Sequence, residues 1–184
     1  MATLAYNIGC SLDGYIHDEN RNFDWTAPSA EFDAWIIQRE RTIGTYLFGR
    51  HLYEAMRIWD TTGADIPPGM LEYRDEVWPG IDKVVYSSTL AAVTEPRWTL
   101  ERTFDPDAVR ARKASSEKDL SCGGAGLAAV ALRAGLVDTI GLLVTPVIVG
   151  GGTRALPADL RLDLELIDER AFDNGVAYLH YRVR

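Results

Sequence analysis

Short apolar runs alternate with amphipathic stretches along most of this chain. Apolar runs without a clean alternation of polar residues are typical of strands that are buried on both faces of a sheet. Six such runs predict strands: Thr3–Cys10, Thr45–Phe48, Lys83–Tyr86, Trp98–Leu100, Asp119–Cys122 and Thr139–Val149.

The stretches between these runs carry helical periodicity and helix-end signals. Ser29 precedes a run whose aromatic and apolar residues fall on one helical face, so it is the expected N-cap. Asp105 caps a second helix, and Gly135 closes a third. The predicted helices are the segment that follows Ser29, His51–Met56, Leu71–Val77, Asp105–Ala114 and Leu127–Ala134.

The pattern changes from Leu162 onward. Leu162–Phe172 and Val176–Val183 alternate in polarity, and Asp173-Asn174-Gly175 between them is a hairpin signal. Together the patterns predict an α/β fold: a mainly parallel sheet with helices on both faces and an antiparallel C-terminal hairpin. Because no linker interrupts the pattern, we expect residues 1–184 to be a single domain.

Composition narrows the function classes. The net charge of −8 argues weakly against nucleic acid as a partner, because phosphate backbones select basic surfaces. We expect a cytoplasmic protein without a membrane partner, since no signal peptide and no apolar run of about 20 residues is present. The only two cysteines, Cys10 and Cys122, lie far apart in apolar runs, which favours buried free thiols and no metal site.

The Gly123-Gly124 turn is the sharpest candidate for ligand binding. A glycine pair between a buried strand and a helix lets the backbone approach a phosphate, and the free amides at the helix start favour an anion. A tight turn with glycines for close packing explains the pair equally well. The turn is not a full G-x-G-x-x-G fingerprint.

Three other strand ends carry small or basic residues. Arg50, after Gly49, can bind phosphate or pair with Glu54 at i+4. Ser87–Thr89 offers hydroxyl donors that also commonly end strands. A flexible bend is the favoured interpretation of Gly150–Gly152.

Asp13 and Glu31 are the candidates for acid–base chemistry. Asp13 ends the first strand, where it can instead form a turn with Gly14. Glu31 opens the first helix, where the helix dipole already favours a carboxylate. The three histidines show no metal spacing, and His180 in the final strand is interpreted as structural.

These segments occur in an order that resembles the dihydrofolate-reductase-like superfamily. Within it, the chain is most similar to the C-terminal reductase domain of the bifunctional riboflavin-pathway deaminase/reductase. The resemblance is carried by SLDGYI (11–16), Trp25, GRHLYEAMRIW (49–59), KVVYSSTL (83–90), LSCGGAGLAAVALRAGLVD (120–138), PVIVGGGTRALP (146–157) and FDNGVAYLHYRV (172–183).

The resemblance implies a three-layer fold with a sheet of about eight strands, and NADPH bound across the strand ends. It assigns cofactor contacts to three segments and places Asp13–Ile16 near the nicotinamide and substrate. The residues that inherit cofactor binding are Ile16, Gly49, Arg50, His51, Ser87, Ser88, Thr89, Gly123, Gly124, Ala125 and Gly126.

The chain departs from these relatives at two functional positions. Ser88 stands where relatives often have an arginine, so NADH remains open beside NADPH. The substrate carboxylate of dihydrofolate reductases falls near Ala30, which leaves Glu31 one residue out of register.

The expected activity is hydride transfer from NADPH to a small pterin-like or aminopyrimidine-like heterocycle or to a carbonyl compound. The alternative is a catalytically silent nucleotide-binding or regulatory module of the same fold. The resemblance also implies a homodimer that pairs through the sheet edge and the C-terminal region.

Overall fold

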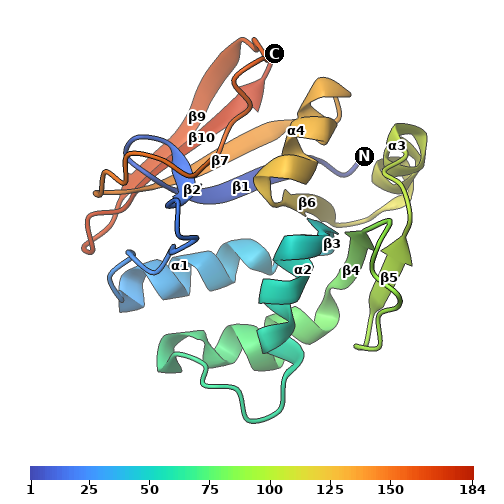
Figure 1. Cartoon of the computed structure of the whole chain (residues 1–184), viewed down its shortest axis with the longest axis horizontal. Coiled ribbons are helices and arrows are strands. Elements are labelled where there is room, and N and C mark those ends of the chain that lie inside the picture. Colours follow the sequence, from blue (N-terminus) through green and yellow to red (C-terminus); the bar gives the residue numbers. More distant parts are fainter.

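Eight strands form one sheet in a computed structural model that describes all residues 1–184 (Figure 1). Their spatial order is β5-β4-β3-β6-β1-β7-β10-β9. Neighbouring strands are parallel except at β10, which runs antiparallel to both β7 and β9. The strands are β1 (Leu4–Ser11), β3 (Ile43–Gly49), β4 (Asp82–Tyr86), β5 (Trp98–Glu101), β6 (Asp119–Gly123), β7 (Thr139–Thr145), β9 (Leu164–Ala171) and β10 (Ala177–Val183). The predicted parallel sheet with a C-terminal hairpin is confirmed.

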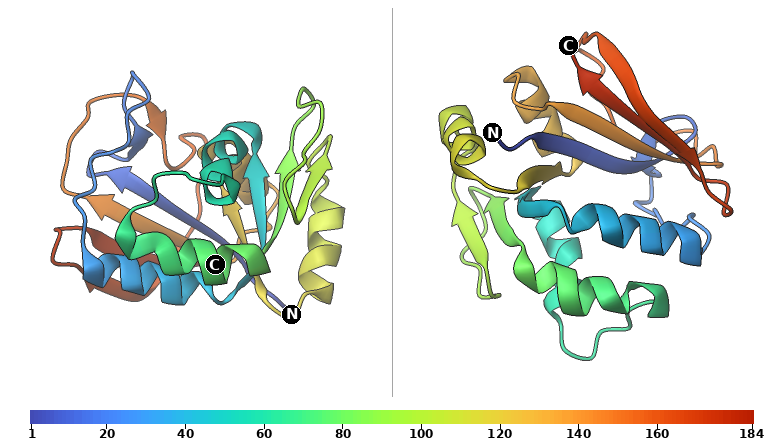
Figure 2. Two further views of the ribbon diagram at one scale, coloured as in Figure 1. Left: turned by 90° about the horizontal axis from the view of Figure 1, so that it is seen from below. Right: turned by 180° about the vertical axis from the view of Figure 1, so that it is seen from behind.

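Helices cover both faces of this sheet. α3 and α4 lie on one face, and α1 lies on the other together with the helical segment that ends at Gly80 (Figures 1 and 2). The α-helices are α1 (Ala30–Glu40), α2 (Arg50–Met56), α3 (Pro106–Ser115) and α4 (Ala125–Arg133). Single turns of other helix types are η1 (Arg57–Asp60), η2 (Pro68–Met70), η3 (Tyr73–Val77) and η4 (Trp78–Gly80). None of these helices is long and apolar enough to cross a lipid bilayer.

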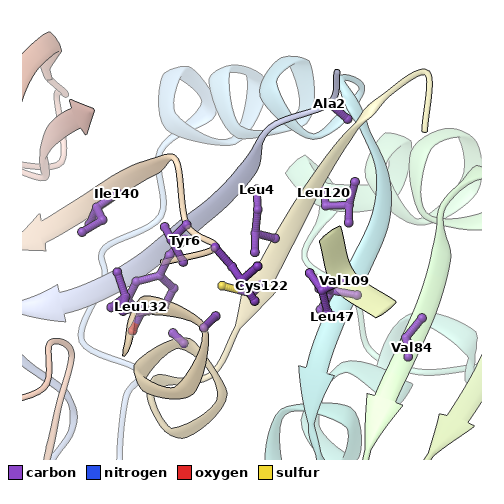
Figure 3. Packing of buried hydrophobic residues seen from close by; sticks show 14 residues of the cluster. Ala2, Leu4, Tyr6, Leu47, Val84, Val109, Leu120, Cys122, Leu132 and Ile140 are labelled. Atoms are coloured by element: carbon purple, nitrogen blue, oxygen red, sulfur yellow. The ribbon is translucent and has the colours of Figure 1, made fainter. Parts of the chain in front are cut away.

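The core is split by the sheet into two apolar layers. On the α3/α4 face, Leu4 and Tyr6 of β1 pack with Cys122 of β6 and Leu132 of α4 (Figure 3). On the α1 face, an aromatic cluster surrounds Trp78, which is 1% exposed. Cys122 and Cys10 are both buried free thiols, as predicted. β1 pairs with β7 from Ala5 to Ser11 but with β6 only from Leu4 to Tyr6, so the carboxyl half of β1 has a neighbouring strand on one side only.

The predicted helix ends are found where side chains can satisfy the backbone. The Ser29 hydroxyl accepts a hydrogen bond of 3.1 Å from the Phe32 amide, and Asp105 caps α3 through the Asp107 amide at 2.9 Å. Gly135 follows α4 with φ of +62°, a conformation that glycine adopts without strain.

The structure differs from the sequence prediction at three places. A small second sheet pairs β2 (Tyr15–His17) with β8 (Thr153–Arg154), and strands this short leave no periodicity to read. β7 ends at Thr145, although the apolar run continues to Val149. α4 begins at Ala125 instead of Leu127, so the helix starts directly after the glycine pair.

Candidate cofactor and substrate site

The sheet order brings three of the predicted segments together. β4, β3 and β6 are consecutive parallel neighbours, so their carboxyl ends lie at the same edge. The segments that follow them are Ser87–Thr89, Gly49-Arg50 and Gly123–Gly126. In open parallel sheets, ligands bind outside this edge.

The two positions of the Gly123-Gly124 turn require glycine for different reasons. A Cβ on Gly123 would lie 2.3 Å from the Leu52 side chain of α2 and 2.9 Å from the Phe48 ring, so Gly123 permits close packing. Gly124 has φ of +86°, which other residues rarely adopt. The packing explanation of the pair therefore holds for Gly123, while Gly124 sets the path of the backbone into α4.

The start of α4 has free amides and open space. The first bond of the helix runs from the Ala128 amide to the Gly124 carbonyl, so the amides of residues 125–127 have no partner within the helix. No side chain caps this end. A Cβ built on Gly126 would have no atom within 4 Å. An uncapped helix start with an uncovered glycine fits the approach of a phosphate group.

Arg50 connects two of the three segments. Its Nε donates to Glu54 at 2.7 Å, which is the intrahelical pair that the spacing allowed, and its Nη1 donates to the Thr89 hydroxyl at 2.8 Å. The guanidinium remains about half exposed at the edge of the sheet. His51, beside it, is almost fully exposed.

The turn after β4 is shaped by Ser87 and by an arginine that the sequence patterns did not single out. The buried Ser87 hydroxyl accepts from the Thr89 and Leu90 amides, at 3.3 and 3.0 Å. Arg102, which follows β5, donates to the carbonyls of Leu90 and Ala91, at 2.5 and 3.2 Å. Ser88 is exposed on the same turn. Arg102 thus adds a positive charge beside the segment in which relatives often carry an arginine.

Asp13 binds backbone amides from a remote segment. Its carboxylate accepts from Val149 at 3.2 Å and from Gly150 at 2.8 Å. Hydrogen bonding from the Ser11 hydroxyl, and then from these amides, lowers the pKa of Asp13 below its ordinary value. The group is therefore ionised near neutral pH and suited to accept hydrogen bonds. Its contact with a substrate stays a prediction.

Glu31 is also engaged in contacts with the C-terminal hairpin. Its carboxylate accepts from Arg170 at 2.7 Å and from the Asp173 amide at 3.2 Å. These bonds tie the first turn of α1 to the turn between β9 and β10. A catalytic role of Glu31 remains a prediction, and the structure gives this side chain a positioning role.

The segment that carries Ile16 is clamped by the Gly150–Gly152 run. Ile16 lies in β2, half-buried. Gly152 lies so close to this strand that a Cβ would be 1.9 Å from the His17 carbonyl oxygen. The glycine run is therefore a close backbone contact that holds β2, and not only a bend.

An uncovered stretch of sheet lies between these segments. Gly9, within β1, is exposed, and no atom lies within 4 Å of the position of its missing side chain. The buried Ser11 and Thr145 follow on the same face as register partners, and Thr145 lies 3.3 Å from the Thr26 hydroxyl. A glycine inside a strand often marks the close approach of another group, so Gly9 is a signal in the sequence that lies outside the strand-end pattern.

Residues 2–178 match the family described as RibD C-terminal domain. The chain belongs to this family. Its membership supports a reductase, and it confirms the family resemblance that the ordered motifs indicated.

Two proteins are similar to this RibD C-terminal domain over nearly their whole length. An uncharacterized protein of Bacillus subtilis, YyaP, is 26% identical over 97% of this chain and 93% of its own. The crystal structure of a putative riboflavin biosynthesis protein from Shewanella is 19% identical, with a TM-score of 0.78 over 100% of this chain and 99% of that one.

A two-activity relative is similar over only part of its length. The deaminase/5-amino-6-(5-phosphoribosylamino)uracil reductase of Thermotoga maritima is 14% identical, with a TM-score of 0.68. The match covers 100% of this RibD C-terminal domain and 57% of that protein. At this identity the likeness shows the fold.

Proposed function

We propose that this domain is an NADPH-dependent reductase of a small aminopyrimidine-like or pterin-like heterocycle. The observation that carries the proposal is that the carboxyl ends of β4, β3 and β6 lie along one edge of the sheet. The uncapped start of α4 follows directly after β6 at this edge. The family membership supports the same class of reaction.

The chain's own residues fit an extended dinucleotide at this edge. The free amides of residues 125–127 are suited to the pyrophosphate, and Arg50 is suited to a second phosphate beside Thr89. Arg102 places a further positive charge beside the turn of Ser87–Thr89. This charge favours NADPH over NADH, because only NADPH carries the extra phosphate. No side chain caps the amides at the start of α4, so these amides are free to bind the pyrophosphate.

The residues around Gly9 and Asp13 would receive the substrate. NADPH, when bound, supplies the hydride. Asp13 holds the Val149–Gly150 segment in place and, being ionised, is unsuited to donate a proton near neutral pH. We therefore assign proton delivery to a water molecule. Ser11 and Thr145 line the same face of the sheet at this end.

The cofactor claim is tested by thermal shift with NADPH and NADH. A cofactor that binds only the native state raises the melting temperature by mass action, and we expect the larger rise with NADPH. Gly126→Ala should fold normally, because its Cβ meets no atom, and should lose most of the NADPH shift, because that Cβ fills the space for the phosphate.

Gly80→Ala is the matched control, since a Cβ at this remote glycine also meets no atom within 4 Å. It should keep the full NADPH shift. A wild-type protein that shows no shift with either cofactor would contradict the proposed function.

Turnover is tested with 5-amino-6-(5-phosphoribosylamino)uracil, the substrate in the name of the Thermotoga maritima protein. Consumption of NADPH that depends on this compound, or on dihydrofolate in a parallel assay, supports the reductase. Binding of NADPH with no turnover across a panel of pterins, pyrimidines and carbonyl compounds would instead support a silent nucleotide-binding module.

A further inference from the structure

Three buried polar atoms on the α1 face of the sheet have no hydrogen-bond partner. They are the Asn7 amide oxygen (Oδ1), the Tyr178 hydroxyl and the His180 Nε2. Buried polar atoms in native proteins are nearly always bonded, so a group of three requires an explanation.

The sheet register places these three residues together. Gly141 of β7 is the register partner of Asn7 on one side and of His180 on the other, so the three residues form one row across β1, β7 and β10. Tyr178 precedes His180 by two residues and shares its face, with the two ring centroids 5.6 Å apart.

Gly141 allows the side chains to meet. The position of its missing Cβ is 2.1 Å from the Asn7 oxygen and 3.0 Å from the edge of the Tyr178 ring. The Asn7 amide therefore leans over β7 toward β10. On the outer side, Trp35 and Arg39 of α1 cover Tyr178, with the Arg39 guanidinium 4.7 Å from its ring centroid.

The two ends of the Asn7 amide face different surroundings. Its oxygen is buried, whereas its nitrogen (Nδ2), which makes no hydrogen bond in the protein, is not among the buried unpartnered atoms and is accessible. Gly9, whose missing side chain leaves open space, lies two residues farther along the same face of β1 and is therefore the neighbour of Asn7 on that face.

The chemistry of the buried atoms is consistent with this orientation. An amide oxygen accepts hydrogen bonds, whereas a tyrosine hydroxyl and an imidazole N–H donate them. Burial, assisted by Arg39, lowers the pKa of His180, so its ring is neutral near pH 7 and carries one N–H. One water in reach of all three atoms would satisfy them, because buried waters typically make about three hydrogen bonds.

We propose that Asn7 is a substrate-recognition residue, oriented by Tyr178 and His180 so that its Nδ2 group donates a hydrogen bond to a carbonyl oxygen of a heterocycle lying over Gly9. The inference rests on the proposed reductase function, since it assumes that the substrate occupies this uncovered part of the sheet. It makes Tyr178 and His180 positioning residues, and it predicts selectivity for ring carbonyls over ring amino groups.

The selectivity is tested by isothermal calorimetry with two probes in saturating NADPH. 5-Aminouracil presents ring carbonyls, and 2,4-diaminopyrimidine presents amino groups at the corresponding positions. We expect the wild type to prefer 5-aminouracil by about tenfold, the effect of one well-placed hydrogen bond. Asn7→Asp replaces the donor with an acceptor of the same shape and should reverse the preference.

His180→Phe tests the orienting role. It keeps Asn7 but removes one of the groups that hold its oxygen, so the preference should fall to about twofold while the thermal shift by NADPH stays unchanged. If Asn7→Asp shows no cooperative unfolding transition, Asn7→Ser replaces it and should abolish the preference.

Retention of the carbonyl preference in the Asn7 variants, or binding of neither probe by the wild type, would overturn the inference. A normal NADPH shift in the same samples would show that the proposed function stands although this inference fails. Loss of both signals would reject the two together.

Discussion

Lys83 is the only charged residue among the buried positions of the protein. It is 1% exposed, and its Nζ donates to the Trp78 carbonyl at 2.6 Å and lies 4.2 Å from the centre of the Trp78 indole. Asp60, which accepts from two indole N–H groups, is the carboxylate that acts most strongly on Lys83. Burial lowers the pKa of Lys83 to about 8, with the attraction of Asp60 acting in the other direction.

This lowered pKa predicts an unusual pH dependence of stability. Between pH 8 and 10.5 the unfolded chain keeps a proton on Lys83 that the native protein has released, so the free energy of unfolding should rise with pH across this interval. Lys83→Met lacks the effect. The melting temperature of the wild type relative to this variant should therefore increase between pH 7.5 and 9.5, and a constant difference would contradict the assignment.

Asp13 binds the backbone amides of Val149 and Gly150 and thereby holds this segment at the candidate site. Asp13→Asn keeps the shape of the side chain but removes the charge that accepts from Val149 and Gly150. We expect lower turnover of the pyrimidine substrate, with NADPH affinity changed by less than a few fold, because the phosphate segments lie on other strands. Unchanged turnover in a steady-state assay would remove Asp13 from the site.

At the scale of single residues, the sequence predicted the strand-end positions of the candidate residues better than the contacts that these residues make. The residues at the strand ends could be predicted because each follows an apolar run directly. The partners of Asp13 and Glu31 could not, since they lie more than 130 positions away in the chain. The strand-end pattern does not point to Asn7 and Gly9, because both residues lie inside a strand.

At the scale of elements, the contact between α1 and the β9/β10 hairpin fixes the start of α1. Ser29 caps α1 and also donates to the Asp173 carboxylate in the hairpin turn. Glu31 and Arg170 add an ion pair across the same contact. The helix start is therefore fixed by residues that come late in the chain.

This contact predicts unequal costs for two N-cap substitutions. Asp105→Ala removes only a cap and should cost about 1 kcal/mol of stability. Ser29→Ala removes a cap and the link to the hairpin, so its cost should be larger. Urea denaturation of both variants measures the difference, and Asp173→Ala should make the two costs equal. Equal costs in the wild-type background would show that the link contributes nothing.

Helices with a capping residue and strands with a long apolar run could be predicted from the sequence. Elements that lack both signals could not. α1 and α3 begin where Ser29 and Asp105 predicted, because each cap satisfies a helix amide. The residues at 73–77, predicted as helix, form a π-type turn around buried aromatic residues, which shows that packing overrides local preference there. The β2/β8 pair depends on a glycine contact that periodicity cannot reveal.

At the scale of the molecule, we propose that β9 is covered in a homodimer. This edge strand is exposed along almost its whole length, and its apolar residues Leu164, Leu166 and Ile167 are 39%, 51% and 38% exposed. Edge strands with exposed apolar residues tend to pair with another chain.

Leu166→Glu should convert the dimer to a monomer, measured by light scattering coupled to size-exclusion chromatography. Leu71→Glu, at a comparably exposed position on the opposite side of the fold, is the control and should stay dimeric. A monomeric wild type at all concentrations would contradict the proposal.

The central place of β1 also governs the order in which the protein can fold during synthesis. Leu4 of β1 pairs with Leu120 of β6, and the other neighbour, β7, begins at Thr139. During synthesis β1 must therefore wait, without a partner strand, until more than a hundred further residues have been made. Throughout that time its apolar residues are open to other chains, and a nascent chain of this kind is a natural client for a chaperone.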